Sequence, residues 1–250
     1  MQPSSRSAKG RPGVISTAAW VVLATTLLIV AWGVFAFGSV YPWAYVPLAL
    51  ASAIVGVLGV TTGTRPVLAG SRPMWWALVG IVIIGLVQLV PLPFSLLAIV
   101  SPGTIDYLRR SDLTFALGAN SVSGTAPVLS HAISLAPALT VRALALLLAP
   151  ALLIAGLTRS LSRTAAFILS TGIVVIGTAV ALIGITQKIV LGDHAFGGMR
   201  IYGFWQPESL LTTPFGPFVN KNHFAGWMLM AIPVAIGLAA SGVANAQSRL

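Results

Sequence analysis

The chain has 250 residues, of which 57% are hydrophobic and only 7% are charged. Soluble domains carry about a quarter charged residues, so this composition excludes a soluble protein and indicates one whose main partner is the lipid bilayer. The net charge of +10 does not indicate nucleic acid, because the 14 Lys and Arg residues are scattered among the ends of apolar runs. The absence of cysteine excludes disulfides and thiolate metal sites.

Six uninterrupted apolar runs are long enough to cross a hydrocarbon core of about 30 Å, which takes about 20 helical residues. In chain order they lie near residues 16–37, 42–61, 74–91, 139–157, 164–189 and 223–241. They are rich in Leu, Ala, Val and Ile and lack the alternation of a barrel strand. The sequence therefore predicts an all-α fold, a polytopic transmembrane helix bundle of about six spans that forms one membrane domain over residues 16–241.

The first run follows a basic segment, residues 1–15. A signal peptide also begins with basic residues, but its apolar region is usually about 7–15 residues long and ends at a small-residue cleavage site. The first run is longer, and no such site precedes Tyr41 and Pro42. We therefore expect this run to stay in the chain as a membrane anchor.

The distribution of Lys and Arg orients the spans, because positive residues favour cytoplasmic loops. With a cytoplasmic N-terminus, eight of these residues lie in short inner segments and six lie in longer outer ones. Residues 1–15 and the tail, 242–250, are then cytoplasmic. The two long loops, 92–138 and 190–222, face the outer side of the membrane.

The first outer loop is punctuated by proline and glycine, which break helices. A plain connecting loop is the favoured interpretation. The alternative is a short interfacial helix near residues 105–117, with Tyr107, Arg109 and Arg110 at the level of the lipid headgroups.

Small residues recur at helical spacing within two of the spans. Ser52 lies four residues before Gly56, and Gly177 lies four residues before Ala181. Such spacings let membrane helices approach closely, although they are also frequent by chance. They predict close packing without naming the partner helix.

A polar cluster marks the start of the last span, where residues 215–226 read Phe-Gly-Pro-Phe-Val-Asn-Lys-Asn-His-Phe-Ala-Gly. Polar groups at the mouth of a membrane span are costly unless something binds them, so we expect function here. Lys221, together with Arg200 in the same outer loop, suits an anionic headgroup or a diphosphate. If the span begins near His223, its free amide groups and the positive end of its dipole would face the same anion.

Simpler roles for these residues remain open. Asn220 and Asn222 are typical helix caps, and at least one of them is expected to cap the last helix. Arg200 and Lys221 would also suit lipid phosphates at the interface. His223 would equally serve as an interfacial histidine without a partner.

Other site chemistry finds little support in the sequence. A zinc site built from Asp193, His194, Glu208 and His223 would use suitable ligands, but no closely spaced pair of histidines accompanies it. The chain has no Gly-x-Ser-x-Gly motif of a serine hydrolase and no glycine-rich nucleotide loop. We therefore predict neither a metal nor a cofactor.

The polar cluster resembles a segment of the bacterial O-antigen ligase and polysaccharide polymerase membrane proteins, in which a basic residue usually lies between the asparagines. Residues 88–93, Gln-Leu-Val-Pro-Leu-Pro, and 133–137, Ile-Ser-Leu-Ala-Pro, are similar to a branch of the same family. The resemblance implies a glycosyltransferase of the bacterial inner membrane. Such an enzyme transfers a glycan from a polyprenyl diphosphate carrier to an acceptor on the outer face.

The resemblance also implies roles for the cluster. A lipid diphosphate is a good leaving group, so catalysis mainly needs cations for its developing charge and a base for the acceptor's proton. Arg200 and Lys221 would then bind the diphosphate of the glycan carrier, Asn220 and Asn222 would shape the pocket, and His223 would stand in as base.

Members of this family are usually longer, with further spans and a large later outer loop that carries arginines and the histidine to which catalysis is ascribed. This sequence has no counterpart of that loop. We expect the chain to be the front portion of such a protein or, less favoured, to pair with a second membrane chain. A noncatalytic membrane fragment and a lipid-linked glycan transporter are the alternatives, and a transporter would need polar or broken helices near the bilayer centre.

Overall fold

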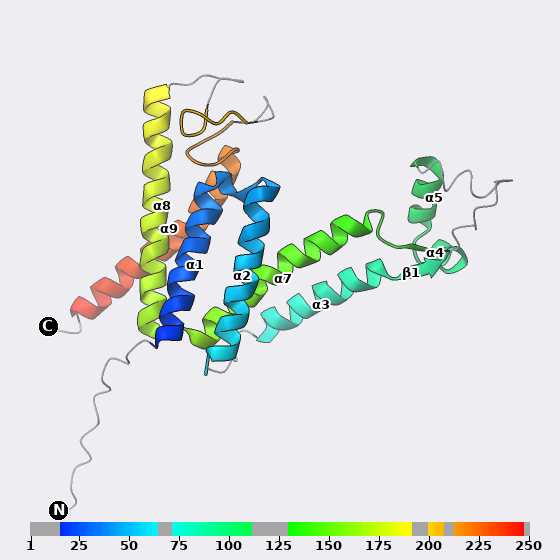
Figure 1. Ribbon diagram of the computed structural model, residues 1–250, viewed down its shortest axis with the longest axis horizontal. Coiled ribbons are helices and arrows are strands. Elements are labelled where there is room, and N and C mark those ends of the chain that lie inside the picture. The colour runs from blue at the N-terminus through cyan, green and yellow to red at the C-terminus, as the bar shows by residue number, and fades with distance from the viewer. Residues whose placement is uncertain (1–15, 65–71, 112–129, 192–199, 208–212, 248–250) are drawn as a thin grey trace, which may run out of the picture. The chain divides into compact units, whose positions relative to one another are not determined.

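The computed structural model describes residues 16–64, 72–111, 130–191, 200–207 and 213–247 (Figure 1). Six helices in these ranges are long and apolar enough to cross a membrane. They are α1 (Thr17–Phe35), α2 (Pro42–Thr62), α3 (Arg72–Leu89), α7 (Pro137–Ser160), α8 (Arg163–Leu191) and α9 (Lys221–Gln247). The predicted fold class is confirmed: the chain is an all-α, multi-pass membrane protein, and each predicted run coincides with one helix apart from a few residues at its ends.

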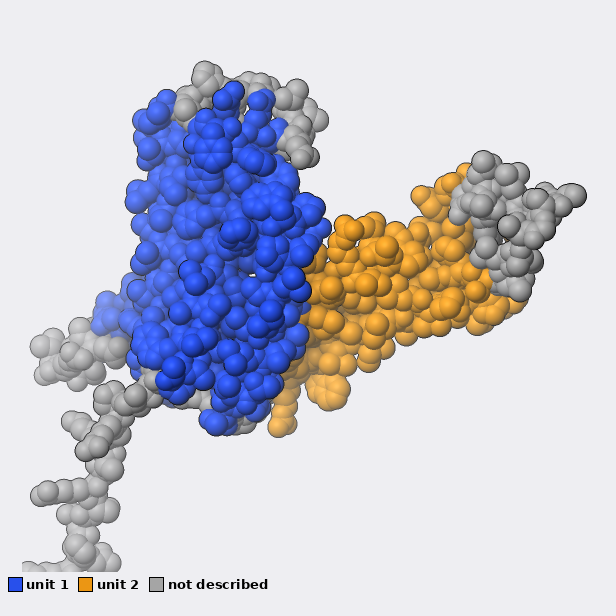
Figure 2. Space-filling view, in the orientation of Figure 1, with its two compact units in different colours: residues 1–67, 149–250 blue, residues 68–148 orange. Residues whose placement is uncertain are grey.

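The chain divides into two compact units (Figure 2). Unit 1 contains residues 1–67 and 149–250, and therefore holds α1, α2, α8, α9 and the second part of α7. Unit 2 contains residues 68–148, which include α3 and the first part of α7. Nothing in the sequence indicated this division of the predicted membrane domain.

In unit 1, α1 and α2 form a hairpin around the short 3₁₀ turn η1 (Phe37–Ser39) (Figure 1). Pro42 begins α2, where its missing N–H leaves no helical bond unmade. Trp32 of α1 donates its indole N–H to the carbonyl of Ala44 at 3.0 Å, which joins the two helices near the turn. The core beneath includes Val22, Leu23, Ile29, Val55, Leu161 and Ala165.

Glycines bring α2 against the second part of α7. A Cβ atom built on Gly59 would lie 2.7 Å from Cα of Gly156, and one built on Gly56 would overlap the backbone of Leu152. The two backbones are therefore in direct contact, as small residues permit in membrane helices. This confirms the close approach predicted from Ser52 and Gly56, and it identifies α7 as the partner.

Arg159 closes the end of α2 in unit 1. Its guanidinium donates to the carbonyl of Val60 at 3.2 Å and to that of Gly63 at 3.1 Å. The last carbonyls of a helix lack partners within the helix, and a cation also suits the negative end of its dipole. Arg159, a residue of the neighbouring helix α7, therefore caps the C-terminal end of α2.

Helix α8 packs against both α1 and α9. A Cβ atom on Gly172 would overlap the side chain of Leu27 on α1, and one on Gly177 would lie 3.1 Å from Cβ of Ala231 on α9. Gly177 thus provides the close approach that its spacing from Ala181 predicted.

In unit 2, the chain between α3 and α7 forms β1 (Pro91–Pro93), α4 (Phe94–Val100), α5 (Pro102–Ser111) and β2 (Ser130–Ala132). The two short strands pair antiparallel, with Leu92 opposite His131. Helix α5 buries Thr104, Ile105 and Leu108 and exposes its charged residues. The interpretation of this region as a plain connecting loop was therefore wrong. The alternative, an interfacial helix near residues 105–117, agrees with α5 as far as Ser111. Residues 112–117 lie outside the described ranges.

Candidate functional site

The loop that precedes α9 lies at one end of unit 1, beside the turn between α1 and α2 (Figure 1). A buried cluster of Phe37, Ile201 and Val219 joins η1 to the two described stretches of the loop between α8 and α9, which was predicted to face the outer side. Because Arg200 precedes Ile201 and Lys221 closely follows Val219, the structure brings both predicted cations to this end. The ends of α2 and α7, where Arg159 lies, are at the opposite end of the unit (Figure 1).

Residues 215–219, which we call the anchor segment, form a tight turn that precedes α9. Phe215 and Phe218 exchange two backbone hydrogen bonds of 3.1 Å. Gly216, between them, has a φ of 56°, a conformation that glycine adopts without steric cost. The turn is buried although it lies in a loop, since Pro217 has no appreciable exposure and Phe218 is 5% exposed.

Two glycines receive the aromatic rings of the anchor segment. The ring of Phe215 lies over Gly184 of α8, where a Cβ atom would come within 2.7 Å of Phe215 Cδ1. The ring of Phe218 lies over Gly38 of η1, where a Cβ atom would lie 2.6 Å from Phe218 Cδ1. The anchor segment is thereby held between α8 and the α1–α2 hairpin, and this contact determines where α9 begins.

Asn220 caps α9, which begins at Lys221, two residues earlier than predicted. The Oδ1 atom of Asn220 accepts a hydrogen bond of 2.8 Å from the backbone N–H of Asn222, the geometry of an N-cap. The expectation that at least one of the two asparagines is a cap is therefore confirmed.

The backbone N–H groups of the first turn of α9 all have acceptors. Lys221 donates to the carbonyl of Thr213 at 2.8 Å, and residues 222–224 donate to the side chain or the carbonyl of Asn220. The prediction that free amide groups would face an anion was wrong, because the cap and the loop already satisfy them. An anion here would be bound by side chains and by the helix dipole.

Three consecutive side chains project from this turn. Lys221, Asn222 and His223 are all exposed, and none of their side chains has a hydrogen-bond partner among the described residues. Successive helical residues point in different directions, so a ligand shared by all three would lie over the end of α9 rather than beside it. The next inward-facing residues, Phe224 and Trp227, pack on Val34 and Val180.

Arg200 is exposed on a fixed piece of backbone. Its carbonyl accepts a hydrogen bond of 3.2 Å from Nε2 of Gln187, a side chain of α8 that is 8% exposed. The next residue, Ile201, is fully buried. In the part of the chain that the structure describes, neither Arg200 nor Lys221 forms a salt bridge with an acid, so both cations are available to a ligand.

Tyr202 occupies a strained turn that sequence analysis did not identify. Ile201 and Trp205 exchange backbone hydrogen bonds of 2.8 and 3.0 Å around it, and Tyr202 has a φ of 55°. Its hydroxyl donates to the carbonyl of Phe35, at the end of α1, over 2.7 Å. Burial raises the pKa of Tyr202 to about 12, so the hydroxyl is a neutral donor near pH 7.

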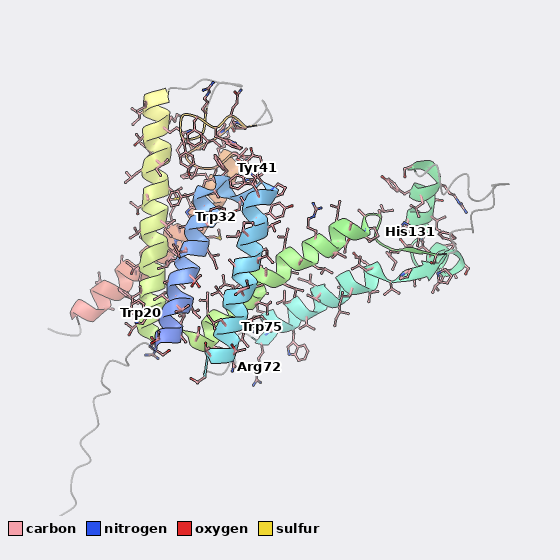
Figure 3. All side chains as sticks on the ribbon, in the orientation of Figure 1. Trp20, Trp32, Tyr41, Arg72, Trp75 and His131 are labelled. Carbon is pink, nitrogen blue, oxygen red and sulfur yellow. The ribbon has the colours of Figure 1, made fainter. Side chains whose placement is uncertain are left out.

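An aromatic cluster supports this end of the unit. Figure 3 labels two of the aromatic residues found here, Trp32 and Tyr41. Ring centroids 4.7 to 6.4 Å apart connect Phe37, Tyr41, Trp43, Tyr202 and Trp205. Trp43 and Trp205 thereby pack η1 against the loop between α8 and α9.

The alternative zinc site falls mostly outside the described residues. Asp193, His194 and Glu208 are not described, and His223 is exposed at the start of α9. Within the described ranges, no three His, Asp or Glu side chains are grouped as metal ligands would be. The described site therefore offers cations, amides and one imidazole, which suits an anionic ligand and a single proton transfer.

Comparisons of the chain with protein-family models, with curated proteins and with solved structures found no match.

Proposed function

We propose that the chain is an O-antigen ligase-like protein of the bacterial inner membrane, and that it binds a polyprenyl diphosphate-linked glycan at the outer end of unit 1. The supporting observation is the exposure of Lys221, Asn222 and His223 without described partners. The buried anchor segment holds these polar groups at the boundary of a membrane span. Exposed cations and donors at the start of a helix are placed to bind an anionic group.

The proposed chemistry follows from the charge of the ligand. Arg200 and Lys221 bind the diphosphate oxygens, and the positive end of the α9 dipole adds to their field. In the transfer, the acceptor hydroxyl oxygen bonds to the anomeric carbon while the bond from that carbon to the diphosphate oxygen breaks. The cations stabilise the charge that develops on the departing diphosphate.

The hydroxyl proton needs a base, and His223 supplies an exposed imidazole at this place. The family to which the cluster is similar places its catalytic histidine in a later outer loop. The proposal therefore assigns lipid diphosphate binding to this chain first. Complete transfer is proposed for an assembly in which a second membrane chain contributes to the site.

Transport has less support among the described residues. A transporter needs polar groups near the bilayer centre, whereas the buried Thr26 donates to the carbonyl of Val22 in its own helix at 2.6 Å. Gln187 lies near the end of α8 and holds the outer loop.

Binding of a polyprenyl diphosphate to the purified chain in nanodiscs tests the proposal. Arg200→Ala and Lys221→Ala should each weaken binding by about 10–100-fold, because a hydrogen bond to a charged group contributes about 1.5–3 kcal/mol. Arg163→Ala is the matched control, since it removes an exposed cation at the start of α8, at the opposite end of unit 1. Unchanged affinity in both site variants would reject the proposed site.

A second assay separates the alternatives. The chain, with and without candidate partner chains, is reconstituted in vesicles with a polyprenyl diphosphate sugar and an outer acceptor. Glycosyl transfer that His223→Ala abolishes without loss of binding supports the catalytic proposal. Binding without transfer under all conditions would identify a noncatalytic fragment, and movement of the lipid-linked glycan across the bilayer would identify a transporter.

A further inference from the structure

An apolar groove follows α1 and α2 on the surface of unit 1. Its volume is about 750 Å³, within the range of about 300–1,000 Å³ typical of ligand sites. Leu28 and Trp32 of α1, Trp43 and Pro47 of α2, and Phe204 of the outer loop line it. The groove is open, because Leu28 and Phe204 are 68% and 69% exposed. It therefore combines the apolar lining of a binding site with direct access from the surroundings.

The outer loop extends this lining beyond the helix ends. The rings of Tyr202 and Phe204 stack with centroids 6.1 Å apart, and both residues line the groove. Tyr202 is fixed by its hydrogen bond to Phe35, another lining residue. Exposing the apolar ring of Phe204 to water is unfavourable. Its position at the end of an apolar groove therefore indicates an apolar ligand.

Backbone strain is concentrated at the same end. Among the described residues, the non-glycine positions with positive φ are Phe37, Ser39 and Tyr202. Phe37 and Tyr202 line the groove. Such conformations are unfavourable for residues with a Cβ atom and are characteristic of binding sites, where the surrounding structure holds them in place.

The charge at this end complements an anion. Arg200 is exposed and lies two residues before Tyr202, so their Cα atoms are at most about 7 Å apart. An apolar groove that ends beside an exposed cation fits an amphiphile with an anionic head and a long hydrocarbon chain.

We propose that this groove binds the isoprenoid chain of the polyprenyl phosphate carrier while Arg200 contacts its phosphate. This inference rests on the proposed function, because it places the hydrocarbon part of the same ligand. A polyprenyl phosphate has one branched, unsaturated chain, which suits a single groove with aromatic walls. A glycerophospholipid has two chains and would leave one of them outside.

Photolabelling of the full chain in nanodiscs tests the groove. The probe is a polyprenyl phosphate with a diazirine on its last isoprene unit, and mass spectrometry maps the labelled residues. Labelling should concentrate on lining residues such as Leu28. Ala31→Trp, which fills the groove, should lower labelling by about tenfold. Ile54→Trp is the matched control, because Ile54 is 67% exposed on α2 but does not line the groove.

Phe204→Ala provides a second variant in case Ala31→Trp does not fold. It removes an exposed ring of the groove without changing the packing between α1 and α2, and it should also lower labelling. Equal labelling of Ile54 and Leu28, or labelling of the groove by a diazirine phosphatidylglycerol as efficient as by the polyprenyl probe, would overturn the inference.

The outcomes for the groove and for the proposed function are distinct. If Arg200→Ala and Lys221→Ala weaken diphosphate binding while the label falls outside the groove, the groove inference is wrong and the proposed function stands. If the label falls in the groove while those variants leave diphosphate binding unchanged, chain binding in the groove stands and the proposed function is rejected.

Discussion

At the residue scale, two asparagines of the same cluster have different roles. Asn220 caps α9 through its side chain, whereas the side chain of Asn222 is exposed and has no partner among the described residues. The sequence predicted a cap in this pair without deciding which residue forms it. That choice depends on the first residue of α9, which is set by the contact of the anchor segment with Gly184 of α8. A tertiary contact of this kind has no local signature in the sequence.

Asn220→Ala should lower the free energy of unfolding by about 1 kcal/mol, since it removes the acceptor of one N–H group in the first turn. Asn220→Ser should retain most of that stability, because serine also caps helices. Denaturant unfolding in micelles measures both effects. Asn222→Ala serves as the control and should change stability little. Equal losses for Asn220→Ala and Asn222→Ala would contradict the assignment of the cap.

The raised pKa of Tyr202 predicts that the protein loses stability at alkaline pH. Its pKa is raised to about 12 by burial, whereas an unfolded tyrosine titrates near about 10. Below pH 10 the hydroxyl is protonated in both states, so its contribution is fully present. Between pH of about 10 and 12 the unfolded chain binds fewer protons, and the free energy of unfolding falls as the pH rises.

Tyr202→Phe should remove this part of the pH dependence. It should also cost about 0.5–1.5 kcal/mol at neutral pH, because the carbonyl of Phe35 loses its donor. Unfolding curves between pH of about 8 and 12 measure both effects. Tyr107→Phe, at an exposed position of α5, is the comparison. If Tyr202→Phe and Tyr107→Phe have the same alkaline slope, the buried hydroxyl does not titrate as proposed.

At the scale of helices, glycine contacts bring several helices of unit 1 close together beside the core of large side chains. Gly56 and Gly59 place α2 on α7, and Gly172 and Gly177 place α8 on α1 and α9. Lipid chains are as apolar as leucine, so helices in a bilayer gain more from close contact than from burying apolar surface.

Gly56→Ala tests this mode of packing. A Cβ atom would overlap the backbone of Leu152, and such overpacking costs about 1–3 kcal/mol. Gly80→Ala on α3 is matched to it, because alanine favours the helix equally at both positions and a Cβ atom at Gly80 meets nothing within 4 Å. Thermal unfolding in nanodiscs should show Gly56→Ala destabilised and Gly80→Ala unchanged or stabilised. Similar shifts for the two variants would exclude the backbone contact.

Hydrophobic runs predicted the helices well because a bilayer requires long apolar segments. They did not predict the pairing of β1 with β2, the helix α4 or the turn η1. These elements are short, and they depend on neighbours distant in sequence. Pro91 and Pro93 favour a loop, yet a two-stranded ribbon tolerates proline because its outer edges need no partner.

For the whole molecule, the predicted orientation can be tested directly because the chain contains no cysteine. A single introduced cysteine is then the sole target for a thiol reagent. Asn222→Cys lies at the site end of unit 1, and Thr164→Cys lies near the start of α8 at the opposite end. Both positions are exposed.

A membrane-impermeant maleimide should label Asn222→Cys in intact spheroplasts, because the excess of positive residues in the other loops keeps those loops in the cytoplasm. Thr164→Cys should react only after the membrane is permeabilised. The reverse pattern would place the cations of the proposed site in the cytoplasm and would remove the outer-face glycosyltransferase as an explanation.

Charge and spacing in the sequence predict the cations of the candidate site but not the groove beside it. Arg200 and Lys221 were recognised from their charge, and both are exposed at one end of unit 1. The groove was not recognised, because its lining comes from α1, α2 and a loop that are far apart in the chain and individually resemble ordinary lipid-facing sequence. Tyr202 and Phe204 gain their significance only when that loop folds back over α1.

The contact between Phe218 and Gly38 has a consequence for biogenesis. Gly38 is synthesised long before Phe218, and at roughly 5–20 residues per second the interval is on the order of 10 s. Throughout that interval the recess at Gly38 lacks its aromatic partner. The α1–α2 hairpin therefore reaches its final packing only after α8 and the loop before α9 have been synthesised.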